Sequence, residues 1–254
     1  MKYYILIAFS FLACKDISKN FAPERPKIST EALDTIQSTP AKIVAAPALF
    51  ETPFIKGTTQ QGKSATINLY GITIGKIKIT SSHIVACDPG HIDEYGIPFT
   101  QAFPNGEYPV QLSIANVSGE ETIAFARINF SDEPVEKWEF ALQKGQSPIP
   151  VGGEKMHGYS VDLGVGVFMD EEASKALDKT HLTDSDADLY KEMNKHYHND
   201  WKYTIYNFGT YNLAAFSSGL GDGYYATYVG FDAKGNPCRL LTDFRLFDWK
   251  GSKK

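Results

Sequence analysis

The stretch Glu107-Tyr108-Pro109-Val110-Gln111-Leu112-Ser113-Ile114 alternates apolar and polar side chains with a period of two, interrupted only at the proline. Successive side chains of a β-strand point to opposite faces of a sheet, so the alternation predicts a strand with one buried and one solvent-facing side. Pro109 has no backbone N–H to donate to a neighbouring strand. We therefore expect this strand to lie at a sheet edge, or to have the proline near its start.

The same alternation recurs on both sides of this stretch. It is present in residues 64–69 and 76–80 before it, and in residues 124–130 after it. The link at Ser118-Gly119 predicts that the 107–114 and 124–130 segments form a β-hairpin. Further strands are expected at residues 204–206, 211–216, 224–231 and 239–244, with a hairpin turn at residues 232–236.

A helical pattern separates these two groups of strands. Residues 170–177 predict a short helix, and Thr183 followed by Asp186 is typical of a capping box that opens a helix from Asp184 to about Asn199. The apolar residues of the longer helix form one stripe, four residues apart: Leu189, Met193 and Tyr197. Strands, one or two helices and then strands, without repeated βαβ units, predict an α+β fold with a mainly antiparallel sheet and the helices inserted between strand groups.

Acidic residues at the start of the longer predicted helix have the spacing of a calcium loop. They are Asp184, Asp186 and Asp188. Leu189 and Lys195, however, stand where such a loop needs a glycine and a bidentate glutamate. We therefore interpret the three acids as first-turn residues that complement the helix dipole.

Two histidines, His196 and His198, lie near the end of the same predicted helix. Side chains two residues apart on a helix point about 200° away from each other, so they cannot share a metal ion unless the helix has already ended and the chain is extended there. The sequence therefore predicts surface histidines.

The amino-acid composition excludes several classes of protein. The chain has 254 residues, of which 43% are hydrophobic and 22% charged, which excludes a disordered or collagenous protein. Its formal charge of −5, without a run of basic residues, argues against a nucleic-acid partner. Three cysteines are too few for a disulfide framework and lack the close Cys/His pairing of a zinc site.

The N-terminus has the form of a secretory signal peptide. Lys2 is followed by eleven residues, 3–13, that are apolar except for Ser10, and then by Cys14. Eleven helical residues reach about 16 Å, half of the roughly 30 Å hydrocarbon core, so a stable membrane span is not expected. The residues Leu12-Ala13-Cys14 resemble a bacterial lipobox, in which the cysteine is lipidated and the preceding peptide is removed. The alternatives are an ordinary signal peptide and an uncleaved anchor.

This resemblance implies a lipid-anchored protein of the bacterial cell envelope, facing either the periplasm or the cell surface. We expect residues 1–13 to be the signal peptide and Cys14 to carry the lipid. Residues 14–48 are rich in proline and poor in aromatic residues, which predicts a flexible tether. Residues 49–250 then form a single globular domain.

The segment Gly221-Asp222-Gly223-Tyr224 has the most unusual local composition of that domain. A glycine on each side lets the backbone turn tightly and present the Asp222 carboxylate, which suits a ligand site. A plain turn that enters a strand is the other interpretation.

The two remaining cysteines, Cys87 and Cys238, form an even pair once Cys14 is assigned to lipid. An extracytoplasmic compartment permits oxidation, so a disulfide between them is one alternative. Two separate buried thiols are the other.

Several stretches, taken in order, resemble the bacterial DUF4241 family over about residues 50 to 245. They are residues 85–89 (VACDP), 104–110 (PNGEYPV), 124–126 (AFA) with 138–139 (WE), 158–164 (GYSVDLG), and 221–224 (GDGY) with 243–244 (DF). The family is uncharacterised, so the resemblance implies a shared fold and no activity. It also implies that Asp88, Asp162 and Asp222 recur as acids with glycine or proline close by.

The function expected from these features is binding without catalysis, with a protein or a polar small molecule as the ligand. The alternative is a metal-assisted hydrolase in which Asp88, Asp162 and Asp222 hold a divalent ion that lowers the pKa of a bound water. Whether the chain is an enzyme stays open at this point, and the sequence assigns no metal and no cofactor.

Overall fold

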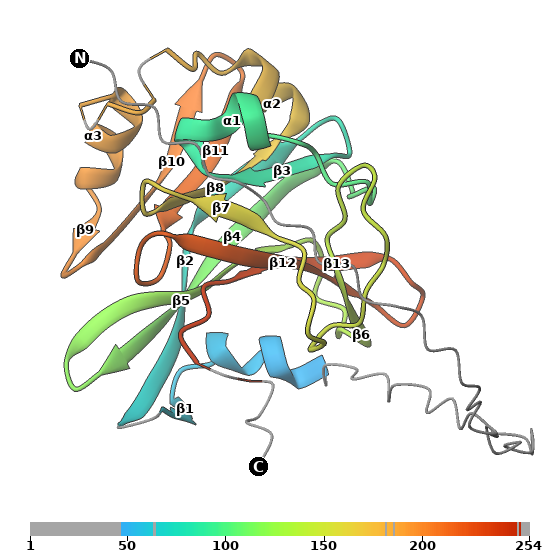
Figure 1. Cartoon of the computed structure of the whole chain (residues 1–254), viewed down its shortest axis with the longest axis vertical. Helices are drawn as coiled ribbons and strands as arrows, with labels where there is room; N and C mark the ends of the chain where they lie inside the picture. Colours follow the sequence, from blue (N-terminus) through green and yellow to red (C-terminus); the bar gives the residue numbers. More distant parts are fainter. Residues whose placement is uncertain (1–46, 63–64, 181, 185, 248, 250–254) are drawn as a thin grey trace, which may run out of the picture. The chain divides into compact units, whose positions relative to one another are not determined.

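Two antiparallel β-sheets form the framework of the protein (Figure 1). The computed structural model describes residues 47–62, 65–180, 182–184, 186–247 and 249, so the predicted signal peptide, Cys14 and nearly all of the predicted tether lie outside the described residues. The described residues belong to one compact unit. Among them, no helix is both long and apolar enough to cross a membrane.

The first sheet, sheet A, has eight strands. Its spatial order is β1 (Thr58–Gln61), β2 (Thr66–Ile79), β4 (Gly106–Val117), β5 (Glu120–Asn129), β13 (Pro237–Asp243), β12 (Gly223–Phe231) and β6 (Lys137–Phe140), and β7 (Tyr159–Val161) also pairs with β12. The predicted hairpin is confirmed, because β4 and β5 pair across the turn at Ser118-Gly119. Pro109 is near the start of β4 and pairs with β2 alone, since the pairing with β5 begins only at Val110.

The second sheet, sheet B, has five strands. Its spatial order is β3 (Ile84–Cys87), β8 (Val165–Asp170), β11 (Tyr211–Ser217), β10 (Trp201–Phe208) and β9 (Tyr197–His198). Every residue of β8 is buried, because sheet B has an apolar layer on each of its faces. Phe168 points into the layer between the two sheets, whereas Val167 and Met169 point to the opposite side.

Three apolar layers result from this alternation. The central one lies between the sheets and includes Leu112 of sheet A and Phe216 of sheet B. The outer face of sheet B is covered by the helices, which are drawn at the top of Figure 1: α1 (Ile92–Tyr95), α2 (Glu171–Ala176) and α3 (Asp188–Asn194). The outer face of sheet A is covered by residues 47–54 and by Leu246, Phe247 and Trp249.

The prediction of a mainly antiparallel fold with helices between strand groups is therefore confirmed in outline, with 47% of the described residues in strands and 13% in helices. The helix predicted over residues 170–177 is present as α2, and the Asp170 side chain caps it. The helix predicted from Asp184 to Asn199 was wrong in both bounds, because α3 spans only Asp188–Asn194. Near its expected end, Tyr197 and His198 pair instead with β10, where Tyr197 lies opposite Lys202.

One buried carboxylate joins the two sheets. Asp170, at the end of β8, accepts hydrogen bonds from the backbone N–H groups of Thr80 (2.8 Å), Ser81 (2.9 Å) and Glu172 (2.9 Å). The hydroxyls of Thr80 and Ser81 donate two more, at 3.1 and 2.8 Å. Burial alone would raise the pKa of Asp170, but these donors hold it below its ordinary value. The end of β2, which precedes Thr80, is thereby fixed to β8 and α2.

A short N-terminal segment covers sheet A. This segment, the strap, comprises residues 47–54 and contains the 3₁₀ turns η1 (Pro47–Phe50) and η2 (Thr52–Phe54). Phe50 is fully buried within four aromatic rings, whose centroids lie 4.9 to 5.9 Å from its own: Phe125, Trp138, Tyr228 and Trp249. A Cβ at Gly71 of β2 would lie 2.5 Å from the carbonyl oxygen of Phe54, so the absence of a side chain there lets the strap approach the sheet.

Glu51 of the strap binds two arginines of sheet A. Its carboxylate oxygens lie 2.8 Å from Nη1 of Arg127 and 3.2 Å from Nη2 of Arg239. The two arginine side chains are only 9% and 7% exposed. Burial, together with the charge of Arg239, lowers the pKa of Arg127 to about 10, and Glu51 opposes this shift. One carboxylate thus compensates two buried positive charges.

Replacing Glu51 by Ala should destabilise the folded body by roughly 3 kcal/mol, because two buried guanidinium groups lose their shared carboxylate. The free energy of unfolding from urea denaturation measures the effect. Glu139→Ala is the matched control. Glu139 lies in sheet A, as both arginines do, but it forms an exposed ion pair with Lys137. Equal losses in the two variants would contradict the role assigned to Glu51.

Candidate functional site

The predicted site residues come together at one corner, where two turns meet. The first turn comprises residues 162–164, after β7, and the second comprises residues 218–222, before β12; we call them the paired turns. In the β7–β12 ladder, Val161 lies opposite Gly223 and Ser160 lies opposite Tyr224. The backbone N–H of Ser218 also donates to the carbonyl of Gly164, at 3.0 Å.

Asp88 lies beneath the first of the paired turns and is fully buried. Its Oδ1 accepts a hydrogen bond from the N–H of Gly90 (2.7 Å), and its Oδ2 accepts from the N–H groups of Asp162 (2.8 Å) and Leu163 (2.9 Å). Both carboxylate oxygens are therefore engaged by the backbone. In this arrangement Asp88 positions the turn that carries Asp162.

Asp162 and Asp222, by contrast, present their side chains to solvent. The Oδ2 of Asp162 lies 3.4 Å from Nε2 of His91, whose ring also contacts Tyr95. Among the residues that the structure describes, no group of three or more His, Cys, Asp or Glu side chains is arranged to hold a metal ion. The three predicted aspartates thus share a corner without forming a ligand cluster there.

The glycine-rich segment is a turn held by side-chain hydrogen bonds. The carbonyl of Gly221 accepts hydrogen bonds from the hydroxyls of Tyr225 (2.7 Å) and Ser218 (2.9 Å), and Gly221 has a φ of +108°. The hydroxyl of Tyr224 accepts a hydrogen bond from the N–H of Gly158, at 3.0 Å. A Cβ at Gly223 would lie 2.8 Å from the ring of Tyr225. These contacts explain the glycines through the geometry of the turn.

The two cysteines are free thiols in this structure. Cys87, on β3, packs in the apolar layer under the helices, whereas Cys238, on β13, packs under the strap. In this structure they are two separate buried thiols and are not joined by a disulfide. Burial raises the pKa of both, most strongly that of Cys87, which keeps them as unreactive thiols near neutral pH.

His196 and His198 are exposed, as predicted, although not on opposite sides of a helix. Because the chain is extended after α3, both rings contact Tyr203 of β10, with centroids 5.0 and 6.1 Å from its ring. His198 also stacks on Trp201, at 4.8 Å. Their role in the structure is to pack on the β9–β10 hairpin.

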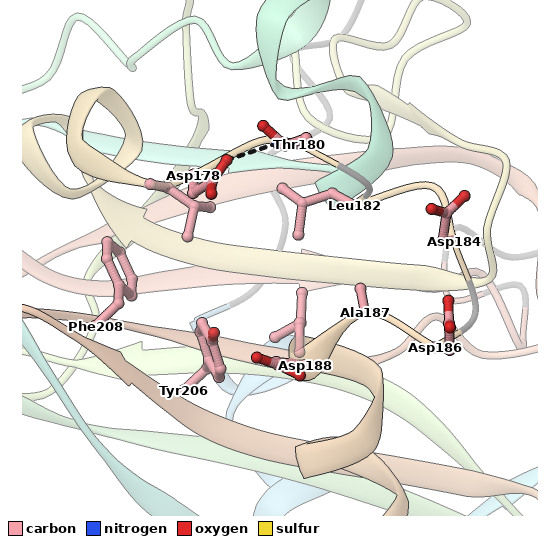
Figure 2. A pocket seen from close by; sticks show the side chains of 11 residues that line it. Asp178, Thr180, Leu182, Asp184, Asp186, Ala187, Asp188, Tyr206 and Phe208 are labelled. Atoms are coloured by element: carbon pink, nitrogen blue, oxygen red, sulfur yellow. Dashed lines mark hydrogen bonds between the residues drawn. The ribbon is translucent and has the colours of Figure 1, made fainter.

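An open cavity of about 500 Å³ lies elsewhere, between the α2–α3 connection and β10 (Figure 2). No pattern in the sequence predicted this cavity. Its described lining consists of Leu177, Asp178, Thr180, Leu182, Asp184, Asp186, Ala187, Asp188, Leu189, Tyr206 and Phe208. Tyr206 and Phe208 form one wall, with ring centroids 5.9 Å apart, because residues two apart on β10 point to the same face.

The acidic side of the cavity is formed by the connection between α2 and α3. Asp178 accepts a hydrogen bond from the N–H of Thr180, at 2.9 Å, which is the dashed line in Figure 2. Asp188 is the first residue of α3 and lies 3.3 Å from Nζ of Lys191. The sequence pattern that could have indicated this side is the run Asp184, Asp186 and Asp188. We had interpreted these acids as first-turn residues of a helix, which gave no reason to expect a cavity beside them.

Replacing Asp88 by Asn should destabilise the protein by roughly 3 kcal/mol, because one backbone donor would then face an amide N–H₂ in the buried site. Asp222→Asn is the matched control at the same corner, because its side chain is exposed, and it should change stability little. Thermal or urea unfolding of both variants tests this. If Asp88→Asn unfolds at the same midpoint as the unsubstituted chain, Asp88 does not stabilise the turn that carries Asp162.

Comparisons with known proteins identify a family for this chain. The comparisons with curated proteins and with solved structures found no match. The family model described as "Protein of unknown function (DUF4241)" matches residues 77–242, from the last three residues of β2 to the next-to-last residue of β13. This span includes the paired turns and the described lining of the cavity, but not the strap. The chain therefore belongs to the DUF4241 family.

Proposed function

We propose that this protein is a lipid-anchored binding module of the bacterial cell envelope, which holds its ligand without catalysis. The observation that carries the binding function is the open cavity beside β10. A cavity of about 500 Å³ has the size of a small-molecule site. Its described lining combines six apolar or aromatic side chains with four aspartates and one threonine, so polar groups that can orient a ligand lie beside apolar surface.

The rigidity of the surroundings supports this proposal. Leu182 and Leu189, which line the cavity, are buried in the apolar layer under the helices. The hydroxyl of Tyr190 donates to the carbonyl of Leu182 at 2.9 Å, which fixes the chain at the cavity wall. A wall that is held in place before the ligand arrives loses less conformational entropy on binding.

The chemistry of the thiols and the aspartates favours binding over catalysis. Both described cysteines are buried thiols with raised pKa values, which does not suit a nucleophile. Asp88, the buried member of the predicted aspartate set, uses both oxygens for backbone N–H groups. No contact of the described residues specifically favours the hydrolase alternative, so it is not developed as a second proposal.

The proposed anchor rests on Cys14 and its resemblance to a lipobox cysteine. The strap supports the arrangement, because a tether that ends at about residue 48 leads directly into a segment fixed to sheet A by Phe50 and Glu51. The proposed tether would therefore join the folded domain at a segment that is fixed to sheet A.

Replacing Cys14 by Ser should release the full-length protein from the membrane, because the serine hydroxyl is not lipidated. Fractionation of cells that produce the full chain, followed by immunoblotting of the soluble and membrane fractions, measures the release. Ser10→Ala is the control for the signal segment and should leave the protein in the membrane fraction. Persistent membrane association of Cys14→Ser would contradict the lipid anchor.

Replacing Ala187 by Phe should abolish ligand binding, because the larger side chain projects from the cavity wall into its volume. A fragment mixture of aromatic and aliphatic amines, alcohols and carboxylates, followed by ligand-observed NMR, supplies the probes. Lys144→Phe adds the same side chain at an exposed loop position outside the lining and is the matched control. The cavity is not the binding site if no fragment binds the unsubstituted protein, or if Ala187→Phe binds the same fragments equally well.

A further inference from the structure

Two exposed histidines of the β9–β10 hairpin, His196 and His198, lie where they can act together (the hairpin is at the left of Figure 1). On a helix they would point away from each other, but α3 ends at Asn194 and the chain is extended at β9. Residues two apart on an extended chain point to the same face, with Cα atoms roughly 6.6 Å apart. Both rings contact Tyr203, which confirms that they share one face of the hairpin.

The orientation of the two imidazole rings leaves their nitrogens accessible. The rings of His196 and His198 are inclined to the ring of Tyr203 by only 21° and 5°, so they are also close to parallel with each other. Stacking occupies the faces of the rings, whereas a ring nitrogen binds a metal through a lone pair in the plane of the ring. Within the described part of the chain, neither ring takes part in a hydrogen bond or an ion pair.

The aromatic residues beneath the histidines are fixed by the core. Trp201, which stacks on His198 at 4.8 Å, is only 3% exposed, and its Nε1 donates to the carboxylate of Glu121 at 3.4 Å. Tyr203, which stacks on His196 at 5.0 Å, packs against the central apolar layer. Both imidazoles are therefore positioned before a ligand arrives, which reduces the conformational entropy that binding would cost.

The neighbouring charged groups do not oppose a bound cation. The Nζ of Lys195 lies 2.5 Å from the carboxylate of Glu192 and is compensated by it. Lys202 points to the other face of β10, where its Nζ donates to the side chain of Asn194 at 2.8 Å. The turn that joins β9 to β10 contributes an exposed acidic residue, Asp200.

We propose that His196 and His198 form a two-imidazole site for a divalent ion of a late transition metal, with Cu²⁺ preferred over Ni²⁺ and Zn²⁺. Imidazole nitrogens suit these three ions, and a given nitrogen site binds Cu²⁺ most tightly of them. The described residues offer no group of three or more metal-ligating side chains, so water completes the coordination.

This metal site is separate from the cavity of the proposed function. Neither histidine belongs to the described lining of the cavity. The inference therefore does not depend on the proposed small-molecule binding, and the fragment experiment with Ala187→Phe can succeed or fail without affecting it.

The first test measures the metal complex of the unsubstituted full chain. The protein is freed of metal with a chelator and titrated separately with Cu²⁺, Ni²⁺ and Zn²⁺ by isothermal calorimetry. Pulsed electron paramagnetic resonance of the Cu²⁺ complex then counts the coordinated imidazoles. Cu²⁺ should bind most tightly, and its spectrum should show two imidazoles on one ion.

Substitutions by phenylalanine locate the site. His196→Phe and His198→Phe each remove a ligand but keep a flat ring that packs on Tyr203. Each should weaken Cu²⁺ binding about 100-fold, because the second imidazole of the pair binds as an intramolecular ligand. His91→Phe is the matched control and should leave the affinity unchanged. The ring of His91 likewise packs on a tyrosine, Tyr95, at 5.8 Å, but no histidine stands two residues away from it.

Three results would overturn the inference. They are a Cu²⁺ spectrum with a single imidazole, a phenylalanine variant of either histidine that binds Cu²⁺ as tightly as the unsubstituted chain, and an equal loss in His91→Phe. Unfolding midpoints of the metal-free variants separate the loss of a ligand from the loss of the fold. If a variant does not fold, the number of imidazoles in the complex of the unsubstituted chain still decides.

Discussion

The carboxylate of Asp170 is the interaction on which the arrangement of the two sheets depends. It is buried, and it is satisfied by five donors from three residues. A buried charge is costly unless its hydrogen-bonding capacity is used. Here the donors are Thr80 and Ser81, which directly follow β2 of sheet A, and Glu172 in the first turn of α2. The Asp170 carboxylate therefore holds together the end of β2, the end of β8 and the start of α2.

Asp88 repeats this arrangement at the other end of the same pair of strands. In the β3–β8 ladder, Ile84 lies opposite Asp170 and Cys87 lies opposite Val167, so Asp88 follows the end of β3 that is remote from Asp170. Each aspartate accepts backbone N–H groups of a connection that would otherwise lack partners. The connections on which the paired turns and α2 depend are consequently rigid for the same physical reason.

Local patterns predicted most of the strands because burial on one face imposes a period of two, as in β4 and β5. They failed at residues 195–199, where the capping signal and the apolar stripe favoured a continued helix. There the pairing of Tyr197 with Lys202 decided the outcome, and that pairing depends on the neighbouring strand β10 and not on the segment itself. Short-range patterns cannot report such a preference.

In the candidate site, too, local patterns predicted some features, whereas others depend on distant segments of the chain. The sequence pointed to residues that share a corner, but it could not show that Asp88 is turned inward onto the backbone while Asp162 faces solvent. The cavity was not predicted because one side comes from described residues between Leu177 and Leu189 and the other from Tyr206 and Phe208. These segments meet only once α3 lies against sheet B and β10 has taken its place in that sheet. A local explanation of the aspartates gave no reason to connect them with the two aromatic residues.

The contact between Phe50 and Trp249 has a consequence for orientation. Their ring centroids are 4.9 Å apart, so the two ends of the described body are held together on the outer face of sheet A. The cavity belongs to the layer outside sheet B, on the other side of the central core. Under the proposed anchoring, the tether would therefore join the body on one side of the central core, and the cavity would lie on the other side. A ligand could then enter the cavity without passing the point where the tether joins the body.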